Sequence, residues 1–147
     1  MLAKSFFEVL IIFVGMKKKT PPPADQLLEE ILKLHIPKDY VKYFELQEVR
    51  NKPDCYELTL HERAEFIPRE LDGKEAVLDG FCNPVSILSH SFSLKKIYLI
   101  VKRRRWKETC TDKHYSNSYD LYPEGLKATH ELVFFFEGLH RGTASES

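Results

Sequence analysis

The sequence of 147 residues has few cysteines and lacks the common catalytic motifs. Its three cysteines, Cys55, Cys82 and Cys110, are an odd number and lie far apart. This excludes the disulfide framework of small secreted domains and favours a reducing cytoplasm. No glycine-rich phosphate loop, nucleophile elbow or HExxH helix is present. We therefore find no sequence motif for phosphoryl transfer, for a serine hydrolase or for a metalloprotease.

The cysteines and histidines also lack a metal-binding pattern. Cys110 and His114 have a spacing that occurs in metal sites, and Cys82, His61 and His90 are further ligand candidates. Zinc motifs of the relevant kind pair their cysteines as Cys-x-x-Cys, and no such pair exists in this chain. We expect isolated thiols and surface histidines, without a metal ion or any other cofactor.

No apolar run is long enough to cross a membrane, because a spanning helix needs about 20 apolar residues. The strongest candidate, Phe6–Val14, is interrupted by Glu8 and is followed by Met16 and a "KKKTPPP" stretch rather than a cleavage site. We expect residues 1–23 to be an apolar leader and Pro-rich linker, either disordered or added by a gene start placed upstream of Met16. An export signal is the alternative.

Acidic residues are absent from positions 80–107, although the chain has 22 basic and 22 acidic residues and a net charge of zero. The acids lie mainly before this window. The cations inside it are Lys95, Lys96, Lys102, Arg103, Arg104, Arg105 and Lys107. The net charge of zero therefore combines an acidic first half of the chain with a basic strip at residues 95–107.

The remaining chain predicts one α+β domain over residues 24–141, followed by a polar tail at 142–147. Apolar residues at helical spacing predict a helix that ends before Pro37. Residues 44–62 predict a hairpin, and residues 67–81 a loop with a weak strand. A second strand pair turns at Ser93-Leu94, and a short strand is expected at 118–122.

A last helix is expected after Thr129, with Leu132, Phe135, Phe136 and Leu139 on one face. Phe134, Phe135 and Phe136 are most simply core residues, although an exposed Phe134 could contact a partner. The expected architecture is a small, mostly antiparallel sheet, made of two hairpins plus a short strand, with flanking N- and C-terminal helices.

The segment "KIYLIVKRRRWK", residues 96–107, contains an apolar half and a cationic half. Its apolar half fits a strand of the sheet. Because unpaired charges are costly to bury, we expect Lys102–Lys107 to project beyond the core as an extended ribbon. Such a ribbon suits a phosphate backbone, and its tryptophan is either a stacking contact or a core residue. The candidate DNA-binding residues are Lys95, Lys96, Lys102, Arg103, Arg104, Arg105, Trp106 and Lys107.

Two other readings remain open for this strip. A charged strand end can simply block edge-to-edge aggregation, and a short basic run can act as a nuclear-import signal. Asp79, Asp112, Asp120 and Glu124 are the carboxylates that a two-metal nuclease would need, but nothing in the sequence singles them out.

Three stretches resemble the N-terminal region of ISAon-type insertion-sequence transposases. They are "IPKDYVKYFELQEV", "DGFCNPVSILSHSFSLKKIYLIVKRRRWK" and "NSYDLYPEGLKATHELVFFFEGL". The shared features are "YFEL" before a hairpin, an arginine run followed by tryptophan, and an aspartate-containing segment before the last helix. In this chain they fall at Tyr43–Leu46, Lys102–Trp106 and Tyr119–Leu121, and the resemblance covers about residues 31–139.

The resemblance implies a prokaryotic mobile element whose terminal DNA this region recognises. It also implies that the catalytic acids lie in a separate downstream DDE-type segment, so that this region is no enzyme by itself. The chain departs from the family pattern at the Ser93-Leu94-Lys95 turn, which lacks the usual glycine, and at residues 109–118. We expect the first frame of a split gene or a remnant of one.

Two functional hypotheses follow from the sequence. The first is a non-catalytic region that binds double-stranded DNA through the basic strand, either alone or as a homo-oligomer. The second is a protein-interaction or regulatory domain in which the basic strand is structural and solvated.

Overall fold

The computed structural model describes residues 23–145, with side chains to residue 142, so the predicted leader lies almost wholly outside the described residues. The chain divides into two compact units, residues 1–30 and 31–147. The division falls within the first described helix, α2 (Ala24–Lys33). Pro37 then precedes the short helix α3 (Lys38–Tyr43) as its N-cap residue, with an extended ψ of 146°.

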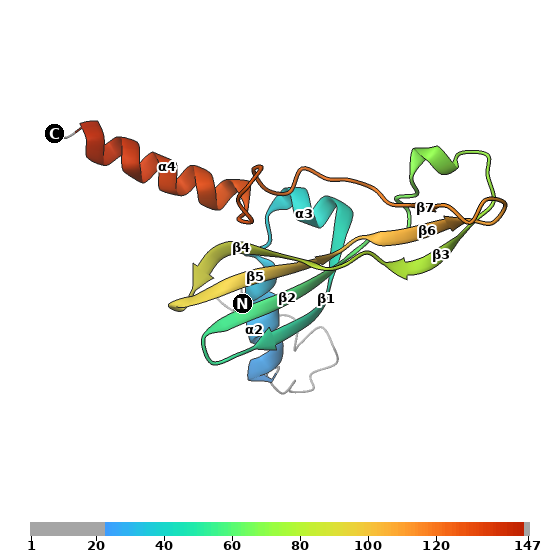
Figure 1. Ribbon diagram of the computed structural model, residues 1–147. Coiled ribbons are helices and arrows are strands. Elements are labelled where there is room, and N and C mark those ends of the chain that lie inside the picture. Colours follow the sequence, from blue (N-terminus) through green and yellow to red (C-terminus); the bar gives the residue numbers. More distant parts are fainter. Residues whose placement is uncertain (1–22, 146–147) are drawn as a thin grey trace, which may run out of the picture. The chain divides into compact units, whose positions relative to one another are not determined.

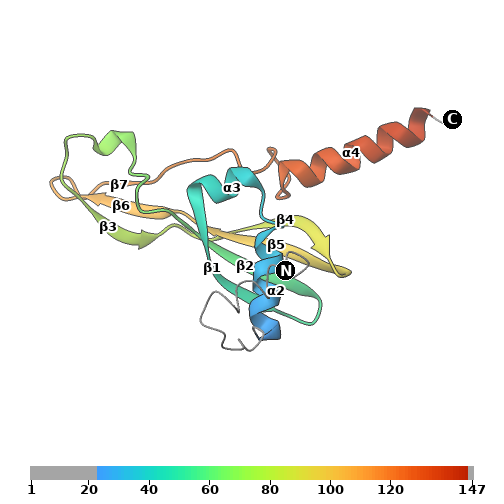
Figure 2. The same cartoon turned by 180° about the vertical axis from the view of Figure 1, so that it is seen from behind.

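The larger unit contains two sheets (Figures 1 and 2). The first has the order β1-β2-β5-β4 and is made of β1 (Phe44–Asn51), β2 (Cys55–Glu62), β4 (Val85–Phe92) and β5 (Lys95–Lys102). The β1–β2 and β4–β5 pairs are antiparallel hairpins, which confirms the two hairpins and the α+β class that the sequence predicted. The hairpins join through a parallel pairing of β2 with β5, which the sequence did not indicate.

The second sheet has the order β3-β6-β7 and is antiparallel throughout. Its strands are β3 (Ala76–Phe81), β6 (Arg104–Glu108) and β7 (His114–Tyr115), and a 3-10 turn (Arg69–Leu71) precedes β3. Strand β3 continues into β4, and β5 continues into β6. Between the two sheets, the Cys82 N–H donates to the Arg103 carbonyl at 2.8 Å and so links the two connecting segments. One long two-stranded ribbon therefore contributes to both sheets.

The core lies on one face of the four-stranded sheet. Alternating residues of β2, β4 and β5 are buried there, and the fully buried ones include Leu58, Leu60, Ile87, Ile97 and Leu99. Burying each such side chain stabilises the fold by about 1.5–3 kcal/mol. Tyr40 of α3 is also buried, and its hydroxyl donates to the Leu121 carbonyl at 2.5 Å.

Residues 118–122 are irregular rather than the predicted strand, and the short strand lies earlier, at β7. Side chains satisfy the polar groups of this segment in place of a neighbouring strand. The Leu121 carbonyl accepts from Tyr40, and the preceding Asn117 carbonyl accepts from Arg103.

The last helix, α4 (His130–Ser145), begins as predicted, because the Thr129 hydroxyl accepts the Leu132 N–H at 3.2 Å. It does not end at Gly142, which lacks the positive φ of a helix-terminating glycine, so the helix enters the predicted polar tail. The expectation that Phe134, Phe135 and Phe136 are core residues is wrong. Leu132 is buried, but all three phenylalanines are more than half exposed.

None of the described helices combines the length and apolar character that a membrane span requires.

Candidate nucleic-acid interface

Lys102 and Arg104 both lie near His61, on the face of β2 and β5 that is opposite the core. Lys102 lies beside His61 in the parallel β2–β5 register. The His61 ring packs on Phe81, with 4.6 Å between ring centroids, and the Arg104 guanidinium lies 5.5 Å above the same Phe81 ring. Burial, with Lys102 and Arg104 adding to it, lowers the pKa of His61. We call Lys102, Arg104, His61 and Phe81 the basic cluster.

Acidic groups compensate this cluster only in part. Glu45 lies opposite His61 on β1 and raises the pKa of His61, against the larger opposing effects. The Glu45 carboxylate lies 4.0 Å from the Arg63 guanidinium. Lys102 forms no ion pair with another described residue. Lys102 is therefore the cation of the basic cluster that has no ion-pair partner among the described residues.

Arg104 also takes part in a buried network around Glu62, the last residue of β2. Glu62 is fully buried, and its carboxylate accepts the Arg104 backbone N–H at 2.9 Å, the Asn117 amide at 3.2 Å and the Tyr119 hydroxyl. The Arg104 Nε donates to the Glu62 carbonyl at 2.7 Å. Burial, reinforced by the bond to Glu62, raises the pKa of Tyr119 above its usual value.

Arg103 points to the other side and donates from Nη1 to the Asn117 carbonyl at 2.8 Å. Arg103 and Arg104 are both half-buried and hold the junction between the two sheets. The sequence had indicated unpaired cations on a projecting ribbon. The structure gives these two arginines partners in their own chain.

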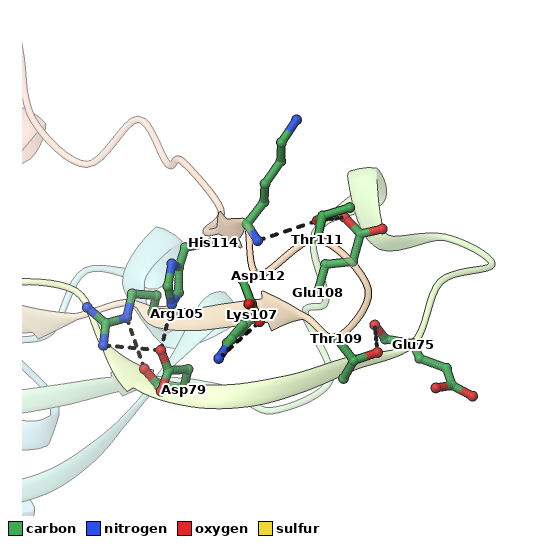
Figure 3. Close-up of polar contacts among 10 residues, drawn as sticks. Glu75, Asp79, Arg105, Lys107, Glu108, Thr109, Thr111, Asp112 and His114 are labelled. Atoms are coloured by element: carbon green, nitrogen blue, oxygen red, sulfur yellow. Dashed lines mark hydrogen bonds and ion pairs between the residues drawn. The ribbon is translucent and has the colours of Figure 1, made fainter.

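Arg105 and Lys107 lie on the opposite face of β6, among acids from neighbouring segments (Figure 3). The Arg105 guanidinium bonds to the Asp79 carbonyl at 3.0 Å and lies 3.4 Å from its carboxylate. The His114 Nε2 lies 2.7 Å from the same carboxylate, and Lys107 lies 3.2 Å from Asp112. His114, followed by Arg105, lowers the pKa of Asp79.

These pairs are exposed to solvent. Exposed ion pairs contribute about 0–1 kcal/mol, so a phosphate can displace them at small cost. The face thus retains cations that a polyanion could recruit, although the protein itself pairs them in the free state.

Trp106 is half-buried, opposite Leu78 of β3 and Tyr115 of β7. Its Nε1 is buried and has no hydrogen-bond partner among the described residues. The ring therefore packs within the three-stranded sheet. This location favours the structural reading of Trp106 over a stacking contact with a base.

The two remaining predicted residues lie at the far end of β5. Lys95 donates to the Asn51 side chain and lies 4.3 Å above the Tyr56 ring, whereas Lys96 is exposed. Lys95 and Lys102 bound a strand of eight residues, which spans roughly 23 Å at about 3.3 Å per residue. The predicted site is therefore divided into two groups.

Reasoning from the sequence named His61, Asp79 and His114 only as metal-ligand or nuclease candidates and did not place them near the arginines, and it did not single out Glu62. The alternation in β2 shows that His61 faces away from Leu60, but only the parallel pairing with β5 brings it to Lys102. Glu62 follows the buried alternation of Leu58 and Leu60, and this parity is the one signal that could have marked it as buried.

Comparison with known protein families, curated proteins and solved structures found no match to this chain.

The candidate metal ligands and nuclease acids do not converge. Among the described residues, no three His, Cys, Asp or Glu side chains gather closely enough to hold a metal ion. Asp79 and Asp112 pair with cations, as described above, and Asp120 bonds to His130 at 2.9 Å.

Proposed function

We propose that this chain is the non-catalytic, DNA-binding N-terminal region of an insertion-sequence transposase, acting in the cytoplasm of a prokaryotic cell. Its ligand is the double-stranded DNA at the ends of the element. The chemistry is supplied by a downstream DDE-type catalytic segment. The sequence resemblance stated above motivates the family, and the basic cluster supports the mode of binding.

The observation that carries this proposal is that Lys102 and Arg104 both lie near His61, on a half-buried face of the sheet opposite the core. Burial, together with the charges of Lys102 and Arg104, lowers the pKa of His61, and a bound phosphate would offset those two positive charges. The exposed cations of β6, Arg105 and Lys107, extend the surface around the same ribbon. Two-stranded β-ribbons are known to bind duplex DNA in either the major or the minor groove.

A second candidate is favoured by a different observation. Arg103 and Arg104 bond to the chain itself, as expected if the basic strand is structural. The chain would then be a protein-interaction or regulatory domain. The exposed phenylalanines Phe134, Phe135 and Phe136 of α4 would form its contact surface.

Salt dependence of duplex binding separates the two functions. We would measure binding of the full chain to fluorescent duplex DNA by anisotropy over a range of salt concentrations. If four to six phosphates are neutralised, log K falls against log salt with a slope of roughly −4 to −5. Flat salt dependence, or no binding at low salt, would favour the interaction domain.

A pair of single variants locates the surface. Lys102→Gln removes a cation that has no ion pair with another described residue, and it should reduce the magnitude of the salt slope by about one. Lys38→Gln removes an exposed cation from α3 and should leave the slope unchanged. Equal effects of the two substitutions would show that binding does not use the basic cluster.

A further inference from the structure

The turn between β4 and β5 carries an unusual residue. Ser93 and Leu94 form a two-residue connection in which both have positive φ, 51° and 65°. Such turns favour asparagine and glycine, because a side chain with a Cβ is strained in this region. Leu94 is also fully exposed, so its side chain adds no burial energy to offset the strain. Nothing in the fold of the described residues explains a leucine at this position.

The surroundings of Leu94 suit contact with a polyanion. Lys95 and Lys96 follow it directly, and Lys96 is exposed. Lys95 is anchored to Asn51 and Tyr56, which steadies the start of β5 immediately after the turn. An apolar tip flanked by cations combines two features that DNA-bending proteins use, a wedge for the base stack and charges for the phosphates.

The separation of Leu94 from the basic cluster is close to the length of one turn of B-DNA. Leu94 and Arg104 lie ten positions apart along the β5–β6 ribbon, which corresponds to at most about 33 Å of extended chain. One turn of B-DNA is about 34 Å long. A ribbon lying along the duplex would therefore bring the tip near the next approach of the same groove.

We propose that Leu94 is a wedge that inserts between two base pairs from the minor groove and kinks the DNA. This inference rests on the proposed function, since it requires duplex binding. The preferred site would be a pyrimidine–purine step, which unstacks and kinks easily. The leucine would occupy a strained turn because the tip needs an apolar side chain rather than a glycine.

Two substitutions distinguish the proposed role of the Leu94 side chain in DNA binding from its effect on the stability of the turn. Leu94→Gly removes the side chain and the backbone strain, and it should raise the melting temperature by about 2–6 °C. Leu94→Ala removes most of the side chain but keeps the Cβ and the strain, so it should not stabilise the fold. Leu34→Ala truncates another exposed leucine and serves as the matched control.

The binding experiment uses a duplex labelled at both ends for energy transfer, with 2-aminopurine at a central TA step. For the original chain we expect a rise in end-to-end transfer and in 2-aminopurine fluorescence on binding. A duplex already kinked by a two-nucleotide bulge should bind about tenfold more tightly, because part of the unstacking is already done. Both Leu94 variants should lose the rise in energy transfer, the rise in 2-aminopurine fluorescence and the preference for the bulged duplex, but should keep the salt slope of binding. Leu34→Ala should behave like the original chain in all four measurements.

The outcomes are distinct. Salt-dependent binding without bending, or bending that survives in both Leu94 variants, would overturn the wedge and leave the proposed function standing. Absence of duplex binding by the original chain would overturn both.

Discussion

Truncation of Glu62 should destabilise the protein more than any surface change near the basic strand. Its carboxylate is fully buried and accepts three hydrogen bonds. In Glu62→Ala, the Asn117 amide would keep its bond to the Phe66 carbonyl at 2.6 Å, but the Arg104 N–H and the Tyr119 hydroxyl would lose their acceptor. Each stranded donor costs about 1–3 kcal/mol, and removing the desolvated charge returns part of this. We expect a net loss of about 3 kcal/mol.

The assay is urea unfolding of the full chain, followed by the fluorescence of Trp106, the only tryptophan. Because this ring lies on β6, close to the network, it reports directly on the junction of the two sheets. Glu62→Gln keeps one acceptor oxygen but turns an amide toward a donor, so an intermediate loss of about 1–2 kcal/mol is expected.

The control is Glu45→Ala, which removes an exposed carboxylate from the neighbouring strand and should cost less than about 1 kcal/mol. An unchanged m-value would show that the transition remains comparable between variants. If Glu62→Ala and Glu45→Ala were equally mild, the reasoning from the buried network would be refuted.

Three further predictions concern charge and protonation. Arg104→Gln should lower the unfolding free energy by about 1–2 kcal/mol, because it loses the hydrogen bond to Glu62. Arg105→Gln, at an exposed position, should lower it by less than about 1 kcal/mol. Equal losses in urea titrations would contradict a structural role that is specific to Arg104. The folded-state pKa of His61 is lowered, so the unfolded chain takes up the proton first, and the free energy of unfolding should fall as pH drops below about 6.5. His61→Gln should reduce the dependence of the unfolding free energy on pH, and an identical pH profile of the two proteins would contradict this role of His61. The pKa of Tyr119 is raised, so the contribution of Tyr119 to the free energy of unfolding is present below about pH 10 and is lost as pH rises above it. Tyr119→Phe should weaken the alkaline destabilisation measured by circular dichroism, and an unchanged alkaline transition would exclude this contribution.

Local patterns in the sequence predicted the local parts of the fold. The alternation around Leu58 and Leu60 predicted a strand with one buried face, and Thr129 predicted the start of the last helix. Both depend on neighbours only a few residues away, so a single sequence contains the necessary information. The turn at Ser93-Leu94 was predicted in the same way.

The errors arose where distant segments meet. The absence of acids from positions 80–107 suggested free cations, but the fold brings Glu62 from one side of this window and Asp112 from the other. The stripe containing Phe135 and Phe136 predicted burial, yet periodicity shows only that an apolar face exists and not whether another element covers it. The sequence therefore located the cations along the chain but could not show which acidic residues the fold brings beside them, and their role in DNA binding stays a prediction.

The parallel pairing of β2 with β5 has a consequence for the order of folding. Each hairpin closes over a short turn, so both can form early and independently. Joining them requires residues 55–61 to meet residues 96–102, with the 3-10 turn, β3 and β4 in the intervening loop. The entropy of closing that loop must be lost before the core between the hairpins can form. Docking of two preformed hairpins is therefore the expected slow step, and until it occurs the cations of Lys102 and Arg104 lack the neighbours on β2 that define the basic cluster.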